Sequence, residues 1–294
     1  MNNLIPRVAI LLAAYNGIKW IEEQVDTISQ QKEVEIDLYI SIDISNDGTH
    51  KRCKDLTSKN ISINILPYGH HFGGAAKNFF RLIRDVDFSD YDYISLADQD
   101  DIWLPEKLSR AVKLITDKKL DGYSSDVIAF WADGRERLVK KSYPQKQFDH
   151  YFESAGPGCT YVFKRESLQK FKDFLIENWN EVNKVELHDW VIYSYFREKS
   201  MSWYIDKVAL MRYRQHENNQ VGVNNGVQAY WSRLQKINNK WYAHEVQKIV
   251  NLTKSHAQDS IVLNKLFLIK NFYHLRRRPR DMIVLLVMIV LGLF

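Results

Sequence analysis

Three carboxylates lie within four positions, at Asp98, Asp100 and Asp101. They follow the apolar residues 93–96, which have the composition of a buried strand, and they precede a helix that opens at Pro105. Such a density of charge is costly in a protein interior unless the carboxylates are paired or bind a metal ion. Because open α/β sheets bind ligands at the carboxyl ends of their strands, this stretch favours a divalent cation that holds a phosphorylated substrate. The competing interpretation is an acidic loop in which Asp100 or Asp101 caps the following helix.

The spacing of the three carboxylates divides them between two roles. Asp98 and Asp100 form an Asp-x-Asp pair, which places both side chains on the same side of an extended segment. Both can then face one cation and a diphosphate. We therefore expect Asp98 and Asp100 to face the substrate and Asp101 to cap the helix at Pro105.

Two further polar clusters follow predicted strands. The first is Ala-Ala-Tyr-Asn at residues 13–16, and the second joins Asp43 to the turn residues 45–47. In a parallel sheet these two strand ends are neighbours. The Tyr15 ring could stack on a pyrimidine base while the Asp43 carboxylate accepts the imide N–H of that base. Taken singly, each cluster is more simply a tyrosine packed on a loop or an aspartate in a turn.

The last cluster is split between His188-Asp189-Trp190 and Arg214-Gln215-His216. Adjacent histidine and aspartate residues among apolar neighbours suggest a general base near a pocket. A second histidine, His216, could complete a metal shell, although a lone histidine is more often structural.

The elements that must position these clusters alternate between strands and helices. Strands are predicted at residues 8–14, 36–43, 61–65 and 93–97, and helices between them at 20–28, 50–59 and 75–86. This alternation predicts an α/β fold with a mostly parallel central sheet flanked by helices. Further elements are a helix at 107–117, strands at 127–131 and 160–163, a helix at 166–178 and a strand-like segment at 203–213.

Two segments are less regular. The polar, basic residues 133–148 have no clear period and are expected to form a loop. Beyond residue 226 the pattern is mainly helical, on the spacing of Trp231, Leu234, Ile237 and Trp241.

Composition excludes several classes of protein. The 294 residues carry a net charge of only +5, and much of the basic excess lies late in the chain, which argues against a nucleic-acid-binding surface. Cys53 and Cys159 are isolated thiols that fit neither a disulfide framework nor a structural zinc site. The N-terminus lacks the plan of a signal peptide, so a cytoplasmic location is expected.

The last residues, 282–294, are almost entirely apolar and follow Arg276, Arg277, Arg278 and Arg280. They are too few to span a bilayer, which needs about 20 apolar residues. We expect an in-plane anchor whose arginines meet anionic lipid at the inner face of the plasma membrane. The alternatives are a buried C-terminal helix or an oligomer contact.

The ordered set of motifs resembles family 2 glycosyltransferases of the GT-A fold. The motifs are Ala-Ala-Tyr-Asn-Gly (13–17), Asp-Ile-Ser-Asn-Asp-Gly-Thr (43–49), Asp-Gln-Asp-Asp-Ile-Trp-Leu-Pro (98–105) and His-Asp-Trp (188–190). The later Arg-Gln-His-Glu-Asn-Asn-Gln-Val-Gly (214–222) is similar to the bacterial rhamnosyltransferase-like branch. Single motifs of this kind are weak, whereas their occurrence in the family's order is a strong signal.

The resemblance implies a role for each matching residue. Asp189 matches the catalytic base, and Asp100 matches the metal-binding carboxylate, with Asp98 and His216 beside Mg²⁺ or Mn²⁺. The positions that match nucleotide-binding residues are Ala13, Tyr15, Asp43, Lys77 and Asp98, and those expected to contact or support the acceptor are His188, Trp190 and Arg214. One departure concerns the family's common Asp-Asp-Gly-Ser loop, which here reads Ile42-Asp43-Ile44-Ser45 and weakens any statement about which base is bound.

The implied activity is metal-dependent transfer of a sugar, with inversion, to a glycan acceptor in the synthesis of bacterial surface polysaccharide such as O-antigen. The favoured donor is dTDP-L-rhamnose, and the acceptor is expected to be linked to a lipid diphosphate. The alternatives are a UDP-hexose or UDP-N-acetylhexosamine transferase of the same fold, or a non-catalytic nucleotide-sugar-binding subunit. A nucleotidyltransferase would need a basic, glycine-rich triphosphate loop, which residues 13–20 do not supply.

The same resemblance divides the chain into three parts. Residues 1–104 would bind the nucleotide sugar, and residues 105–225 would bind the acceptor and carry the base within the same GT-A domain. Residues 226–294 would form a helical extension that ends in the apolar tail.

Overall fold

Strand β1 (Arg7–Ala14) lies between β4 and β2 in the interior of a 7-stranded sheet with the order β10-β6-β9-β4-β1-β2-β3. The computed structural model describes residues 5–216, 240–254 and 263–294. The other strands of this sheet are β2 (Glu35–Ile42), β3 (Ser62–Ile65), β4 (Tyr93–Asp98), β6 (Gly122–Ser125), β9 (Val162–Lys164) and β10 (Trp203–Asp206). All neighbours in it are parallel except β9, which is antiparallel to both β4 and β6. The predicted α/β fold with a mostly parallel central sheet is therefore confirmed.

A second sheet of 4 strands has the order β5-β11-β7-β8. Its strands are β5 (Ile102–Trp103), β7 (Val127–Trp131), β8 (Glu136–Val139) and β11 (Met211–Gln215). Pairing of β11 with β5 brings residues 211–215 beside the segment that follows the three carboxylates. This sheet therefore places the late Arg-Gln-His motif next to the Asp-x-Asp loop.

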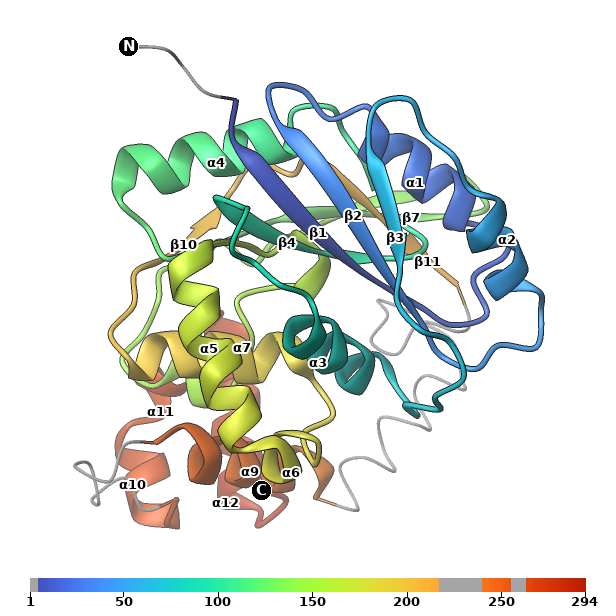
Figure 1. Ribbon diagram of the computed structural model, residues 1–294. Helices are drawn as coiled ribbons and strands as arrows, with labels where there is room; N and C mark the ends of the chain where they lie inside the picture. The colour runs from blue at the N-terminus through green and yellow to red at the C-terminus, as the bar shows by residue number, and fades with distance from the viewer. Residues whose placement is uncertain (1–4, 217–239, 255–262) are drawn as a thin grey trace.

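The continuous apolar run of β1 is explained by cover on both faces of the main sheet. Val8, Ile10 and Leu12 point into one core, with α1 (Ile21–Ser29), α2 (Thr49–Asp55) and α4 (Lys107–Lys118). Ala9 and Leu11 point into the other core, with α3 (Ala75–Asp85), α5 (Arg165–Glu177) and α7 (His188–Glu198). In Figure 1, α1 and α2 lie on the opposite side of the strands from α3, α5 and α7.

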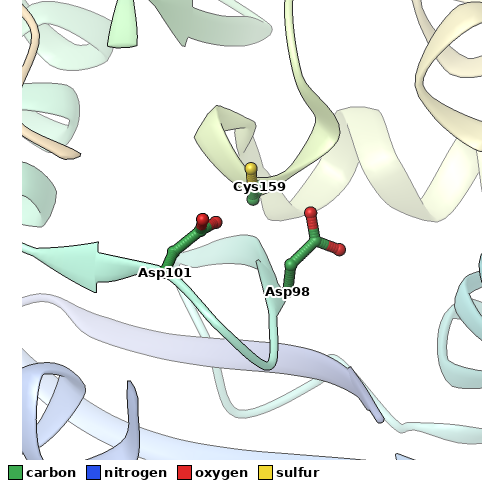
Figure 2. A group of neighbouring side chains, drawn as sticks. All are labelled: Asp98, Asp101 and Cys159. Carbon is green, nitrogen blue, oxygen red and sulfur yellow. The ribbon is translucent and has the colours of Figure 1, made fainter. Parts of the chain in front are cut away.

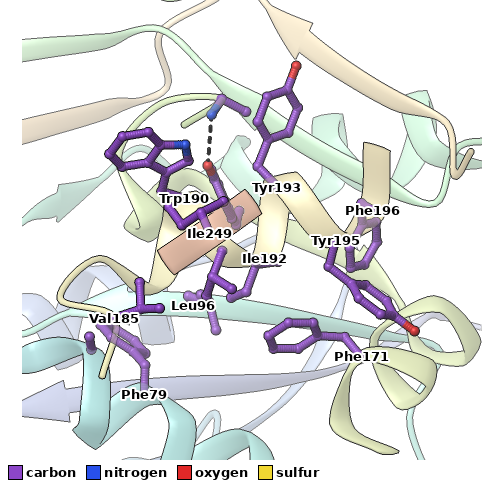
Figure 3. Packing of buried hydrophobic residues seen from close by; sticks show 14 of the residues in the cluster. Phe79, Leu96, Phe171, Val185, Trp190, Ile192, Tyr193, Tyr195, Phe196 and Ile249 are labelled. Atoms are coloured by element: carbon purple, nitrogen blue, oxygen red, sulfur yellow. Dashed lines mark hydrogen bonds between the residues drawn. The ribbon is translucent and has the colours of Figure 1, made fainter. Parts of the chain in front are cut away.

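Helix α7 is the main hydrophobic element of the second core. Ile192 and Phe196 are fully buried on it, and Phe171 of α5 and Phe79 of α3 belong to the same cluster (Figure 3). Because its core-facing side chains are so fully buried, α7 holds its first turn, which contains Asp189, in a fixed position.

The C-terminal helices belong to this same core. They are α9 (Trp241–Thr253), α10 (Lys265–Lys270), α11 (Phe272–Leu275) and α12 (Pro279–Val290), and in Figure 1 they gather at the end of the molecule where the short α6 (Trp179–Val182) also lies. Ile249, Leu285 and Ile289 are buried in the cluster. The Arg277 guanidinium forms buried ion pairs with Asp149, in the 3-10 turn η1 (Asp149–Tyr151), and with Glu153.

Several predicted elements differ from the observed ones. The strand-like segment 203–213 is divided between β10 and β11, which belong to different sheets. The expected loop at 133–148 contains β8, and the predicted strand at 160–163 is the 3-10 turn η2 (Gly158–Thr160) followed by β9. Trp231, Leu234 and Ile237 lie outside the described residues, as does the predicted boundary at 225.

Candidate functional site

A cavity of about 1160 Å³ opens at the carboxyl ends of β1, β2 and β4. One part of it, which we call the strand-end half, is lined by residues 13–16, 98–100 and 73–75 together with Trp20, Asp43, His71, Asn78 and His216. The other part, the basic half, is lined by residues 137–141, Glu153, Ser154, residues 156–158, Tyr143, Arg277, Arg278, Arg280 and Asp281. Asp189 lines the cavity and interacts electrostatically with both Asp98 and Lys141. This places Asp189 between the two halves.

Most of the residues expected from the sequence come together around this cavity. Those that line it are Ala13, Tyr15, Asp43, Asp98, Asp100, His188, Asp189 and His216. Lys77, Trp190 and Arg214 are not among its lining residues. Lys77 is exposed on α3, and Trp190 is buried, where its indole N–H donates to the carbonyl of His150.

The Asp-x-Asp loop is held by contacts from β11 and from the residue that follows this strand, more than a hundred residues later in the chain. The Nε2 atom of His216 lies 2.5 Å from Oδ2 of Asp100, and the His216 ring stacks on Trp20 with 4.2 Å between centroids. Arg214 donates from Nε to the Asp100 carbonyl at 2.8 Å. Arg214 therefore fixes the backbone of the loop, while His216 fixes the Asp100 side chain.

Asp101 does not cap the helix that follows, so that prediction was wrong. Helix α4 begins at Lys107, and its N-cap position, Glu106, makes no side-chain capping bond. The Asp101 carboxylate is buried and accepts from the backbone N–H of Arg214 at 3.3 Å. Its other oxygen has no hydrogen-bond partner among the described residues. Asp101 thus helps to tie the loop to β11.

Asp98 also belongs to a group with Asp101 and Cys159, whose candidate ligand atoms all lie within 4.8 Å of one another. In Figure 2 both carboxylates point toward the Cys159 sulfur. Asp101 and Cys159 are buried behind Asp98 and do not line the cavity. Burial and the two carboxylates raise the pKa of the Cys159 thiol well above its usual range, and burial lowers the pKa of the adjacent Lys107 to about 7.

The residues that line the cavity suit a hard divalent cation. Burial, and then the neighbouring Asp100 carboxylate, raise the pKa of Asp98 to about 7, so the two like charges are close and poorly compensated. Carboxylate oxygens with one imidazole nitrogen are a donor set that Mg²⁺ and Mn²⁺ accept. The protonated, enclosed Cys159 is a poor ligand for either ion. We therefore assign the stronger candidate site to Asp98, Asp100 and His216.

The two residues predicted to bind the nucleobase, Tyr15 and Asp43, differ in how exposed they are. The Tyr15 ring is 53% exposed at the cavity edge, as a stacking surface would be. Asp43 is buried, and its oxygens accept from the backbone N–H groups of Phe72 and Gly73 at 2.9 and 3.0 Å. Asp43 therefore orders the loop of residues 71–73 beside the cavity. A hydrogen bond from a nucleobase to Asp43 would come in addition to these backbone hydrogen bonds.

Asp189 and His188 lie next to each other but differ in their chemistry. Burial raises the pKa of Asp189 to about 6, opposed by hydrogen bonds from Ser154 and from the Trp190 N–H. Burial lowers the pKa of His188 to about 3, and its ring stacks on Phe79 at 4.1 Å. A Cβ atom at Gly158 would lie 2.2 Å from Nε2 of His188. His188 is thus a neutral packing residue, and Asp189 is a carboxylate that remains mostly ionised at neutral pH.

Three residues of the site were not predicted from the sequence. The Gln99 side chain exchanges two hydrogen bonds with the backbone of Tyr15, at 2.8 and 2.7 Å, and so joins the ends of β1 and β4. Trp20 supports His216, and Lys141 enters from the segment predicted to be a loop. Only Gln99 carried a local signal, since it stands between the two carboxylates of the Asp-x-Asp pair.

The site can be compared with known proteins. Residues 9–174 match the family model described as Glycosyl transferase family 2. Over 292 residues the chain is 48% identical to the dTDP-rhamnosyl transferase RfbG of Shigella flexneri, and the match covers 96% of this chain and 100% of that relative.

Solved structures with similar folds have much lower sequence identity. TarS residues 1–349 of S. aureus in complex with UDP give a TM-score of 0.56 at 15% identity, covering 91% of this chain and 72% of that one. The mannosyltransferase PcManGT of Pyrobaculum calidifontis, in complex with GDP-Man and Mn²⁺, gives 0.56 at 15% identity, covering 99% and 82%. These likenesses confirm the predicted GT-A architecture. With the family match and the full-length relative, they show that this chain is a glycosyltransferase of family 2.

Proposed function

We propose that the protein transfers L-rhamnose from dTDP-L-rhamnose to a glycan acceptor, with inversion at the anomeric carbon. The observation that carries this proposal is the single cavity in which Asp98, Asp100 and His216 meet Asp189. The choice of donor is supported by the 48% identity to a dTDP-rhamnosyl transferase. Within the chain we assign donor binding to residues 1–104, acceptor binding and the base to 105–225, and the helical extension to 226–294.

The chain's own residues account for the proton transfer. Asp189 takes the proton from the acceptor hydroxyl as that oxygen bonds to the anomeric carbon, and the bond from this carbon to the diphosphate breaks. Its pKa of about 6 lets Asp189 accept a proton at neutral pH. The α7 core holds the carboxylate in place, and His188 fills the space beside it.

The leaving group is proposed to be held in the strand-end half. Asp98, Asp100 and His216 would bind Mg²⁺ or Mn²⁺, a choice supported by the Mn²⁺ bound to the structurally similar mannosyltransferase. The cation would supply charge compensation for the departing nucleoside diphosphate. His216, braced by Trp20, keeps the Asp100 carboxylate turned toward the cavity.

A binding panel tests the choice of donor. We expect dTDP-L-rhamnose with Mn²⁺ to raise the melting temperature more than UDP-glucose or UDP-N-acetylglucosamine does, because binding to the folded state alone stabilises it. Thermal shift with and without Mn²⁺ is the measurement. A larger shift with a UDP-sugar would replace the donor assignment and leave the reaction class intact.

The apolar tail is proposed to hold the enzyme on the inner face of the plasma membrane. No helix within the described ranges is long and apolar enough to cross a bilayer. Helix α12 buries Leu285 and Ile289 against the core, yet it exposes Ile283, Val284, Val287 and Val290. One face of α12 therefore packs on the core, as in the buried-helix interpretation. The other face is free to enter a lipid interface, as the anchor interpretation requires. Arg276 and Arg277 pair with protein carboxylates, so neither is the lipid contact that was predicted.

Charges placed on the exposed face of α12 should release the protein from membranes. We expect the double substitution Val284→Asp and Val287→Asp to lower binding to anionic vesicles at least tenfold, because both side chains are about half exposed and their loss opens no cavity. Sedimentation with vesicles is the measurement. Ile176→Asp, on an exposed position of α5, is the matched control and should bind as the native chain does. Unchanged sedimentation of the double variant would show that α12 is not the anchor.

A further inference from the structure

The basic half of the cavity contains more positive charge than the protein neutralises. Lys140, Lys141, Arg137 and Arg278 line it, and none of them forms an ion pair with another described residue. The acidic groups nearby are already engaged, since Glu153 pairs with Arg276 and Arg277, and Asp281 pairs with Arg276 and Arg280. Unpaired cations that line a cavity favour an anionic ligand.

Lys141 is the most informative of these residues. Its aliphatic stem lies against Gly156, where an added Cβ would meet Cγ of Lys141 at 3.6 Å. Burial, together with the neighbouring Arg277 and Arg276 guanidiniums, lowers its pKa, although Glu153 opposes this effect. Lys141 is half-buried at the cavity wall, and a partly desolvated ammonium group gains from a bound anion. Because it also interacts with Asp189, Lys141 links the basic half to the proposed base.

The basic half adjoins the first turn of α12, the helix whose exposed face is proposed to meet the membrane. Arg278 is the N-cap residue of this 12-residue helix, and Arg280 lies in its first turn. The exposed Ile283 and Val284 follow within one further turn. If the outer face of α12 enters the lipid interface, the arginines and Lys141 lie at the depth of lipid phosphates.

We propose that the basic half, through Lys141 and Arg278 with help from Lys140, binds the diphosphate of a lipid-linked acceptor. The lipid chain would extend along the exposed face of α12, and the glycan beyond the diphosphate would reach Asp189. This inference rests on the proposed function, because it assumes that a glycan acceptor enters the cavity from the side opposite the donor. It assigns the basic half to the acceptor and the strand-end half to the donor.

A binding experiment with farnesyl diphosphate tests the assignment. Calorimetric titration in neutral detergent with EDTA excludes binding through a metal at Asp100. We expect binding that farnesol does not reproduce, and a Kd at least tenfold higher for Lys141→Gln with Arg278→Gln. Lys270→Gln removes one charge from an exposed position of the same C-terminal extension and should leave the Kd unchanged. Arg278→Gln alone should weaken binding severalfold, and it is the fallback if the double variant does not fold.

A competition experiment distinguishes a site for a lipid diphosphate from the site for the nucleoside diphosphate. The competition is run with Mn²⁺ in place of EDTA, so that dTDP binds its own site. Saturating dTDP should then not displace farnesyl diphosphate if the two occupy different halves of the cavity. Full displacement, an unchanged Kd in the double variant, or an equal loss in Lys270→Gln would each overturn the proposal. The titration needs no turnover and no rhamnose, so failure of the donor assignment would leave its result interpretable.

Discussion

Replacing Asp189 with asparagine is expected to lower kcat about a thousandfold, within the range that a general base contributes to enzymatic rates. Asparagine has nearly the same shape but cannot take the proton from the acceptor hydroxyl. Donor binding should change little, because Asp189 lies between the two halves of the cavity and is not among the proposed metal ligands. Steady-state release of nucleoside diphosphate gives kcat, and calorimetry with the unreactive product dTDP gives the affinity.

The control for this substitution is Asp173→Asn, an exposed position on α5 that should leave both quantities unchanged. A variant at Asp189 that keeps a tenth or more of the native kcat would show that another group is the base. Equal loss of dTDP affinity and kcat would instead place Asp189 in donor binding.

Asp100→Asn is expected to remove most of the Mn²⁺-dependent binding of dTDP and to lower kcat/KM on the order of a thousandfold, since a bound cation contributes several kcal/mol of charge stabilisation. The physical reason is the loss of the carboxylate that faces the cavity beside Asp98 and contacts His216. Calorimetric titration of dTDP at increasing Mn²⁺ concentration is the measurement.

Cys159→Ser and Asp101→Asn distinguish this metal site from the buried group in Figure 2. Both should retain the Mn²⁺ dependence of dTDP binding, because neither residue lines the cavity. The opposite pattern, in which these variants lose the dependence and Asp100→Asn keeps it, would move the metal to Asp98, Asp101 and Cys159.

The sequence predicted best those features that depend on neighbouring residues. The aliphatic run of β1 indicates a strand covered on both faces, and the polar residues after β1, β2 and β4 mark the ends that meet at the cavity. Helices α3, α4 and α5 were placed within one residue of their observed bounds. Each of these features follows from periodicity or from the rule for parallel sheets.

Features that depend on distant contacts were missed. Asp101 looked like a helix cap because its partner, the Arg214 N–H, is 113 residues away. Lys141 stands in a polar stretch without a period, and only the folded chain shows that it lines the cavity near Asp189. Arg277 was expected at the membrane, whereas Asp149 and Glu153 hold it in the core.

The most direct measurement of the central claim is sugar transfer itself. Purified protein with Mn²⁺, dTDP-L-rhamnose and a lipid-diphosphate-linked glycan from a bacterial envelope should release dTDP and lengthen the glycan by one rhamnose, and the Asp189→Asn variant should do neither at a comparable rate. Native protein that releases no nucleoside diphosphate from dTDP-L-rhamnose or from any UDP-hexose would contradict the account.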